Sequence, residues 1–254
     1  MKDIQSQPDD RNMPIDQVGV KDIRFPVRVQ DKRNGSQHTV ATVNMYVTLP
    51  HNFRGTHMSR FLEILNCYEE ITPSHIPAIL EEMKSKLNAE TAYFDIEFPY
   101  FIMKSAPVSK AKSVMEYICS IHGDSSAEFY FLKVKVPVMS LCPCSKEISR
   151  FGAHNQRSII EISIKTRKKI WFEELITIAE SSASSEIYSL LKREDEKYVT
   201  ENSYNNPAFV EDIVRAIAVK LKDHELIDGF SVESENMESI HNHSAYAKIV
   251  YNIL

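Results

Sequence analysis

Residues 23–49, IRFPVRVQDKRNGSQHTVATVNMYVTL, decide the fold of this chain. The stretches from Ile23 to Val29 and from Val40 to Leu49 have the β-branched and aromatic alternation of strands, and Asn34-Gly35 between them is typical of a hairpin turn. The segment therefore predicts two antiparallel strands. The preceding residues, 1–20, are polar and predict a mobile N-terminal arm.

Two helices and two further strands follow the hairpin. Apolar side chains recur at helical spacing in residues 58–65 and 76–87, with Thr72-Pro73 between the two sets. Strand character returns in residues 92–102 and 114–121. The first half of the chain therefore has the order two strands, two helices, two strands.

The second half repeats this order. Four segments have strand character: residues 129–138, 158–165, 230–235 and 245–253. Residues 172–182 predict a helix with a short continuation through Leu190-Leu191, and Asn206-Pro207 predicts the cap of a longer helix. One face of that longer helix carries Phe209, Val210, Ile213, Val214, Ile217 and Leu221. The turn at residues 123–126 marks the boundary between the halves.

The repeat predicts an α+β protein built of two units, residues 21–123 and 124–254. Each unit would be a four-stranded antiparallel sheet with two helices on one face. Such a sheet leaves its other face and its edges uncovered, and assembly with further copies is one way to cover them. Periodicity alone leaves a monomeric pair of α+β domains open as the alternative.

Composition excludes several classes of protein. The chain has 254 residues, of which 43% are hydrophobic, so it can bury a large core. It has no run of roughly 18 apolar residues and no basic N-terminus before an apolar stretch, which argues against a membrane span and a signal peptide. Four cysteines without a paired framework agree with a reducing compartment, and a net charge of -5 argues against nucleic-acid binding. We therefore expect a cytoplasmic protein.

The stretch LCPCSKEISRFGAHNQRS, residues 141–158, carries the chemistry of the chain. It places the thiols of Cys142 and Cys144 and the imidazole of His154 beside several cations. Thiolate and imidazole bind zinc-like or iron-like divalent ions, and nearby Lys and Arg side chains suit an anionic substrate. Buried thiols also act as small hydrophobic groups, so the spacing leaves both a metal or reactive site and a structural role open.

Four segments together resemble the prokaryotic type IB GTP cyclohydrolase family (GTP cyclohydrolase I). They are LPHNFRGTHMSRFLEIL at 49–65, LCPCSKEISRFGAHNQRS at 141–158, LLKREDEKYVTENSYNNPAFVEDIVR at 190–215 and ESIHNHSAYA at 238–247. The resemblance covers nearly the whole chain after the first two dozen or so residues. It implies tandem tunnel-fold (T-fold) units that join edge to edge, a homotetramer, and active sites at the seams between subunits.

The resemblance also implies a metal centre. Its ligands would be Cys142, His154, Glu196 and His241, a thiolate, two imidazoles and a carboxylate, which suit a divalent ion. Zinc, iron, manganese and cobalt all accept such ligands, so the sequence does not identify the metal. Without the resemblance, the charged run around Glu196 would be typical of a solvated face.

The activity that the resemblance implies is the conversion of GTP and water to 7,8-dihydroneopterin triphosphate and formate, the first step of tetrahydrofolate and pterin synthesis. The implied catalytic residues are Cys142, Cys144, His241 and Glu238. Glu211 is the implied anchor of the purine, because a carboxylate accepts from paired N–H donors. The groups implied for the triphosphate are His57 and Arg60 at a helix start, Lys146, Arg150 and Arg157 around the cysteines, and Arg193.

Two other kinds of function remain open. One is a related tunnel-fold purine enzyme, either a cyclohydrolase that yields a cyclic phosphate or a reductase with a cysteine nucleophile. The mass of the product and the release of formate separate these activities. The other is a metal-binding scaffold without catalysis, which would bind GTP and never release formate.

Overall fold

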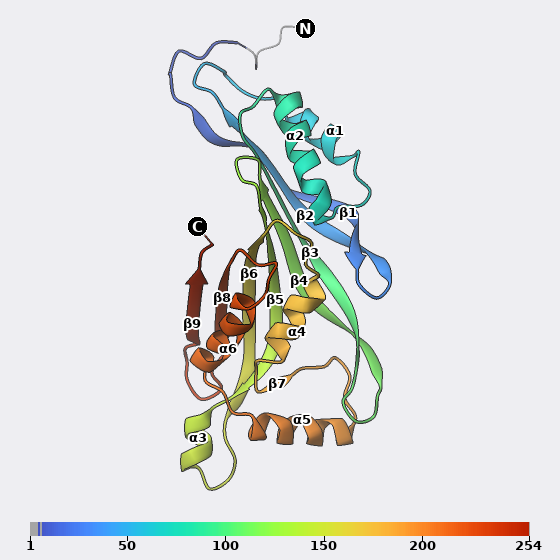
Figure 1. Ribbon diagram of the computed structural model, residues 1–254, viewed down its shortest axis with the longest axis vertical. Helices are drawn as coiled ribbons and strands as arrows, with labels where there is room; N and C mark the ends of the chain where they lie inside the picture. Colours follow the sequence, from blue (N-terminus) through green and yellow to red (C-terminus); the bar gives the residue numbers. More distant parts are fainter. Residues whose placement is uncertain (1–4, 6, 254) are drawn as a thin grey trace. The chain divides into compact units, whose positions relative to one another are not determined.

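The structure of this protein is a computed structural model, which describes residue 5 and residues 7–253 (Figure 1). Its strands are β1 (Ile15–Asp31), β2 (Gly35–Leu49), β3 (Ala92–Ser105), β4 (Lys112–Asp124), β5 (Tyr130–Leu141), β6 (Asn155–Thr166), β7 (Ser185–Glu186), β8 (Gly229–Asn236) and β9 (Ala245–Tyr251). Its α-helices are α1 (Met58–Leu65), α2 (Ile76–Leu87), α3 (Pro143–Ile148), α4 (Phe172–Glu180), α5 (Arg193–Asn205) and α6 (Val210–Lys222).

The strands pair in the order β1-β2-β3-β4-β5-β6-β8-β9, and β7 pairs with β5. The protein is therefore of the α+β class with an antiparallel sheet, which confirms the class predicted from the sequence. In the described part of the chain, every helix is too short or too polar to span a membrane.

Contacts divide the chain into two compact units. The first comprises the chain up to Pro99 together with Ser120–Phe131, and the second comprises Tyr100–Cys119 and the chain from Leu132 onward. The long strands β3 and β4 contribute residues to both units. The contacts therefore divide the chain differently from the single boundary near Gly123 that the repeat predicts. The division into tandem T-fold units stays a prediction.

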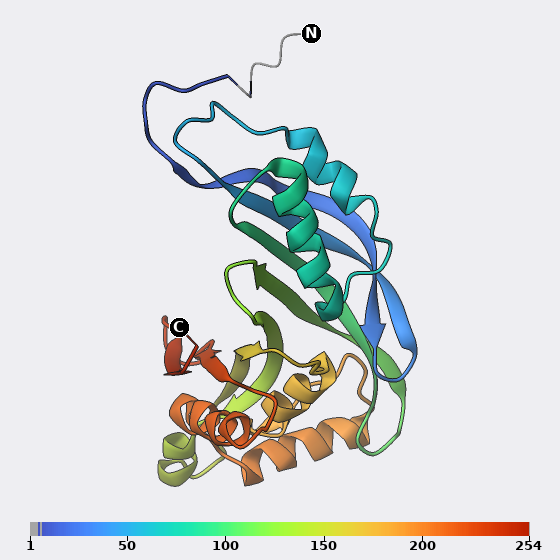
Figure 2. The ribbon, with the colours of Figure 1, turned by 45° about the horizontal axis from the view of Figure 1, so that its top comes forward.

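The first unit is built on the predicted hairpin. β1 and β2 pair antiparallel up to Asp31 opposite Gly35, and Gly35 has a positive φ of 81°, which a glycine adopts without strain. Helices α1 and α2 lie on one face of these strands (Figure 2). The core of the unit includes Ala41, Val43, Met45, Val47, Phe61, Ile64, Ile79, Leu80 and Met83. The hairpin and both helices are confirmed.

β1 begins earlier than the sequence predicts. It starts at Ile15, so residues 15–20, assigned to the mobile arm, are strand residues. A register shift beside Asp22, which has a positive φ of 59°, interrupts the alternation that marks a strand. This bulge explains why the pattern failed to indicate the true start. Residues 1–4 and 6 of the predicted arm lie outside the described residues.

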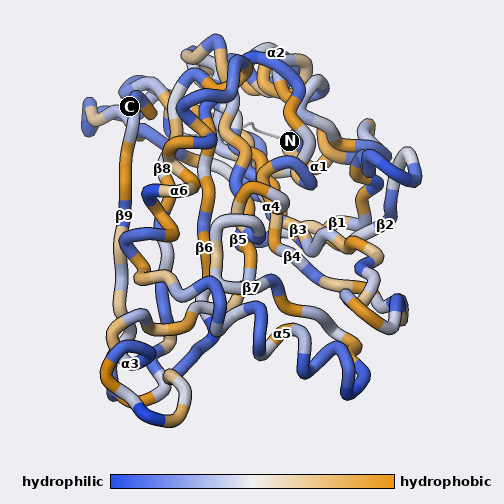
Figure 3. The backbone as a smooth tube through the Cα atoms, turned by 60° about the horizontal axis from the view of Figure 1, so that its bottom comes forward, coloured by the Kyte–Doolittle hydropathy of each residue, from blue (hydrophilic) through white to orange (hydrophobic). Residues whose placement is uncertain are grey.

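Two helices of the second unit are absent from the sequence prediction. α3 forms inside the segment from Cys142 to His154, which we call the cysteine loop. α5 occupies the segment around Glu196 whose charges are typical of a solvated face. Because α5 is largely hydrophilic (Figure 3), its apolar periodicity is weak. The helical continuation through Leu190-Leu191 is wrong, since the chain before α5 instead forms β7 and an irregular link. The second unit thus has four described α-helices rather than two.

α6 is confirmed, but its predicted cap is wrong. The helix begins at Val210, and the N–H of its N-cap residue, Phe209, donates to Oδ2 of Asp212 at 3.1 Å. Asn206 is instead the C-cap of α5. Asn206-Pro207 therefore separates the two helices, which fits the missing N–H and the fixed φ of proline.

The second-unit sheet carries its core on one face and charge on the other. Along β5, β6 and β8 buried aliphatic residues alternate with less buried polar ones. On the polar side, Lys133 Nζ lies 2.7 Å from Glu161 Oε1, and Lys248 Nζ lies 3.0 Å from Glu233 Oε2. These cross-strand pairs keep that face hydrated.

Candidate active site and metal centre

The loop that carries the cysteines is closed by hydrogen bonds. Cys142 follows β5 directly and is the N-cap of α3, where its Sγ accepts from the Ser145 N–H at 3.4 Å. The Cys142 N–H donates to the carbonyl oxygen of His154 at 3.1 Å. The His154 N–H in turn donates to Ser145 Oγ at 3.1 Å, and Gly152 makes the turn with a φ of 92°. The structure therefore joins the backbones of Cys142 and His154, while their role as ligands of one metal ion stays a prediction.

The imidazole of His154 has two acceptors beside one nitrogen. Its Nδ1 lies 2.9 Å from Oε1 of Gln156 and 3.7 Å from Oε2 of Glu238. Glu238 follows β8, and the Met237 N–H fixes this point of the chain by donating to the Arg157 carbonyl oxygen at 3.0 Å. The predicted catalytic residue Glu238 thus lies beside the predicted ligand His154.

The other two predicted metal ligands lie on more exposed segments. Glu196 is an exposed residue of the first turn of α5. His241 is exposed in the β8–β9 connection, where its ring stacks on that of His243 with centroids 5.1 Å apart. Among the described residues, no three His, Cys, Asp or Glu side chains converge closely enough to hold a metal ion. The donor types fit a divalent ion, but one chain does not present them as a closed set.

Asp195 is completely buried at the start of α5, and its role was not predicted from the sequence. Its carboxylate accepts from the N–H groups of Val108, Ser109 and Lys192 at 2.8, 2.9 and 2.8 Å and from Ser109 Oγ at 2.5 Å. Burial raises the pKa of Asp195, but the bonds from Ser109 and the backbone outweigh it and lower the pKa well below its usual range. Asp195 therefore fastens α5, and with it Glu196, to the β3–β4 connection.

A pocket with a volume of about 470 Å³ lies between the cysteine loop and α5. Gly152 and Asn155 line one side, and Thr200 and Tyr204 of α5 line the other. Such a volume suits a small organic ligand. Glu196 precedes Thr200 by four residues, so helix geometry places both on the same side of α5. The pocket is our candidate for part of the substrate site.

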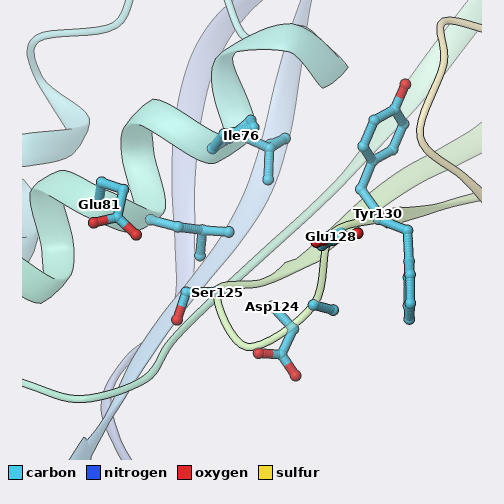
Figure 4. Close-up of a pocket in the computed structure, with 10 residues that line it drawn as sticks. Ile76, Glu81, Asp124, Ser125, Glu128 and Tyr130 are labelled. Atoms are coloured by element: carbon cyan, nitrogen blue, oxygen red, sulfur yellow. The ribbon is translucent and has the colours of Figure 1, made fainter.

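A second pocket, in the first unit, has the wrong charge for this role. It lies between α2 and the β4–β5 connection and has a volume of about 280 Å³ (Figure 4). The carboxylates of Glu81, Asp124 and Glu128 belong to its lining, and no Lys, Arg or His is among the described residues that line it. Three acidic residues repel a triphosphate more strongly than the single one, Glu201, among the described residues that line the pocket beside the cysteine loop.

Two of the predicted phosphate-binding cations donate hydrogen bonds to backbone carbonyl oxygens. Lys146 Nζ donates to the Tyr204 carbonyl oxygen at 2.6 Å and lies 4.4 Å from the centre of the Tyr204 ring. These two contacts link α3 to α5. In the first unit, Arg60 Nη1 donates to the Lys86 carbonyl oxygen of α2 at 2.8 Å. Phosphate binding stays a prediction for these two residues and for His57, Arg150, Arg157 and Arg193.

Glu211 and Cys144 are both accessible. Glu211 is an exposed residue of the first turn of α6, where the sequence predicted it. Cys144 is a free, exposed thiol in α3, two residues beyond Cys142. A substrate could therefore reach either side chain, although their roles stay predictions.

The fold is shared with the urate oxidases. Uricase from Arthrobacter globiformis aligns with a TM-score of 0.51 at 9% identity and covers 92% of this chain and 93% of that chain. A hyperthermostable mutant of the urate oxidase from Bacillus sp. TB-90 aligns with a TM-score of 0.55 at 10% identity and covers 94% and 99%. At this identity the likeness shows the fold alone, and it places the chain in the α+β class with T-fold-like architecture.

The family follows from the sequence comparisons. Residues 1–247 match the profile of the family described as type I GTP cyclohydrolase folE2. The relative named GTP cyclohydrolase FolE2 from Geotalea uraniireducens is 59% identical over 251 residues, which cover 98% of this chain and 93% of the relative. The relative of that name from Pseudothermotoga lettingae is 55% identical over 253 residues and covers 98% of both. This chain therefore belongs to the type I GTP cyclohydrolase folE2 family, which confirms the resemblance stated above.

Proposed function

We propose that this protein is a divalent-metal-dependent GTP cyclohydrolase, which converts GTP and water to 7,8-dihydroneopterin triphosphate and formate in tetrahydrofolate and pterin synthesis. The observation that carries the proposal is the match of residues 1–247 to the family. The closed loop of Cys142 and His154, with Glu238 beside it, supports it. The four free cysteines agree with the predicted cytoplasmic location.

Cys142, His154, Glu196 and His241 would hold the metal ion. Their thiolate, imidazole and carboxylate donors accept zinc, iron or manganese. When bound, the ion supplies a water of lowered pKa, which can act as a nucleophile at neutral pH. The hydrogen-bonded link between Cys142 and His154 supports this set, because it holds two donors on one short loop.

The remaining residues would bind the substrate and move protons. Glu238, Cys144 and His241 are the proposed acid–base groups for the purine ring nitrogens. Glu211 would accept from the N–H groups on the purine edge, and its exposure at the start of α6 leaves it accessible. Arg60, His57, Lys146 and Arg157 would bind the triphosphate as charge-assisted donors.

We also propose a homotetramer with active sites at the seams between subunits. The strand order ends at β1 and β9, which leaves sheet edges available for pairing with another chain. In the cysteine loop, Ile148 and Phe151 are 84% and 89% exposed, which is unusual for large apolar side chains close to a functional site. Coverage of this loop by a second copy would bury both of these side chains.

The activity is tested by incubating metal-stripped protein with GTP and each divalent ion in turn. Formate release and a fluorescent pterin after oxidation are the expected result. A cyclic-phosphate product, identified by mass, would indicate the related cyclohydrolase, and a reduced purine without formate would indicate the reductase. Metal and GTP binding with no formate under any ion would reduce the protein to a scaffold.

The assembly is tested by mixing two inactive variants. His154→Ala removes a proposed metal ligand and Glu211→Ala removes the proposed purine anchor, so each should be inactive alone. Co-refolding should restore part of the activity if one seam takes these residues from different subunits. An active monomer in sedimentation experiments would rule out the seam.

A further inference from the structure

A hydrogen-bond network of buried polar side chains connects His154 to the sheet. Gln156 of β6 is 7% exposed, and Ser140 of β5 and Ser158 of β6 are completely buried. Gln156 Nε2 donates to Ser140 Oγ at 2.9 Å, and Ser158 Oγ donates to Ser140 Oγ at 2.8 Å. Because Gln156 and Ser158 are two residues apart in a strand, both point to the same face. None of these three residues has a role in the catalytic mechanism proposed above.

The hydrogen bonds fix the direction in which the Gln156 amide points. Its nitrogen faces Ser140, so its oxygen faces His154 Nδ1 at 2.9 Å. A carboxylate oxygen of Glu238 lies 3.7 Å from the same Nδ1. Both neighbours of this nitrogen are acceptors, which favours a proton on Nδ1. In neutral imidazole the lone pair then lies on Nε2.

From this geometry we infer that Gln156 is a positioning residue, which holds His154 in the Nδ1–H tautomer and so presets Nε2 to bind a divalent metal ion. The inference rests on the proposed assignment of His154 as a ligand. A rotation of the amide by half a turn would set its N–H against the Nδ1–H and remove one of the two donors to the buried Ser140 Oγ. Such unsatisfied buried groups are costly, so the sheet itself keeps the tautomer.

The test measures the tautomer and the metal affinity separately. Isotope-labelled histidine in the metal-free full-length protein, studied by NMR above the pH range in which histidine protonates, reports which nitrogen of His154 carries the proton. Wild type should show Nδ1–H. Gln156→Leu, similar in size but without an acceptor, should give a mixture of tautomers and about 10- to 100-fold weaker binding of zinc or cobalt, as for other residues that orient a metal ligand.

Two matched variants sharpen the result. Gln156→Glu keeps an acceptor oxygen toward the ring, so it should keep the Nδ1–H tautomer and bind metal within a few-fold of wild type. Gln37→Leu removes a side-chain amide from the first unit, where it donates to Asp31, and should leave both measurements unchanged. If Gln156→Leu does not fold, Ser140→Ala frees the same amide more mildly and should shift both measurements in the same direction, by less.

The outcomes that overturn the inference are distinct from failure of the proposed function. An Nε2–H tautomer in wild type refutes it, and so does a Gln156→Leu protein with unchanged tautomer and metal affinity. Full metal content in His154→Ala would instead remove His154 from the ligand set, while the tautomer measurement would still decide the role of Gln156.

Discussion

The two segments that carry the proposed imidazole ligands are built differently. His154 lies in a loop closed by backbone hydrogen bonds to Cys142, and its ring has a side-chain partner. His241 lies in an exposed connection, where its ring stacks only on another exposed histidine, His243. Of the proposed donors, His154 is therefore held by a closed loop, whereas His241 is held by an exposed segment. Substitutions in the cysteine loop and in the β8–β9 connection should therefore differ in their effects.

The largest effect is expected from removing the thiol of the closed loop. Cys142→Ala should lose bound metal and cyclohydrolase activity together, by about 100-fold or more, because a missing ligand weakens a site severely and leaves the remaining donors short of a full set. Metal analysis and formate release measure the two losses. Cys67→Ala removes an exposed thiol of the first unit and serves as the control. Full metal content and normal turnover in Cys142→Ala would contradict the assignment.

A smaller loss of metal binding is expected from substitutions in the β8–β9 connection. His241→Ala should weaken metal binding by at least roughly 10-fold, because losing a residue that only orients a ligand already costs about 10- to 100-fold. His243→Ala, only two residues away and stacked on the same ring, should remain within a few-fold of wild type. Equilibrium binding of zinc measures both. Equal losses in the two variants would show that the stacked pair acts as a unit and that His241 has no special role.

The anchor of α5 gives a prediction about stability and pH. Asp195→Asn keeps the shape but removes the charge that four hydrogen bonds satisfy. We expect the Tm near neutral pH to fall by roughly 5 °C, the order expected for the loss of charge-assisted bonds. The pKa of Asp195 is lowered from its ordinary value of 3.8. The ionised carboxylate therefore stabilises the fold above that pH, and the benefit is lost as the pH falls toward the folded-state value.

The pH dependence is the control for this prediction. Melting curves of wild type and Asp195→Asn should converge as the pH is lowered below about 4, because protonation removes the same charge in wild type. A Tm difference that stays constant into acid would mean that the effect comes from packing and not from the carboxylate.

The smallest effect is expected at Lys146. Lys146→Met removes the donor to the Tyr204 carbonyl oxygen and the cation over its ring, at an exposed site where such an interaction is worth about 0.5–1 kcal/mol. Chemical denaturation should therefore show a small loss of stability, while the KM for GTP should rise if Lys146 also meets the triphosphate. An unchanged KM would mean that Lys146 only links α3 to α5 and does not bind the triphosphate.

The fold was predictable where periodicity is strong. The hairpin at Asn34-Gly35 and the helices α1, α2, α4 and α6 follow from alternation and apolar spacing. α5 was missed because it is mostly polar and depends on Asp195, and the start of β1 was missed because a bulge at Asp22 interrupts its pattern. The hydrogen bond from the Lys192 N–H to Asp195 starts the helix in the manner of a capping box, but lysine is not a usual N-cap residue, so the sequence did not indicate it.

The site was predictable in part. The spacing of Cys142 and His154 indicated one loop around a glycine turn, and the resemblance supplied Glu238, which lies beside His154. The roles of the three residues stay predictions. The role of Gln156 was not predicted, although it occupies an inward-facing position of a strand whose other inward positions hold serine, isoleucine and threonine. A glutamine there must find buried partners, and only the three-dimensional arrangement shows that one of them is an imidazole.

The closure of the cysteine loop also has a consequence for chelation. Two donors on a flexible chain must be brought together at each binding event, and the entropy of that closure reduces affinity. Here the Cys142 N–H and the His154 carbonyl oxygen have already made the ring, with Gly152 relieving the strain of its turn. If these two residues are the ligands that we propose, an incoming ion would meet them already joined through their backbones, at a high effective concentration. Affinity could then be tuned by the backbone of this ring without changing any donor atom.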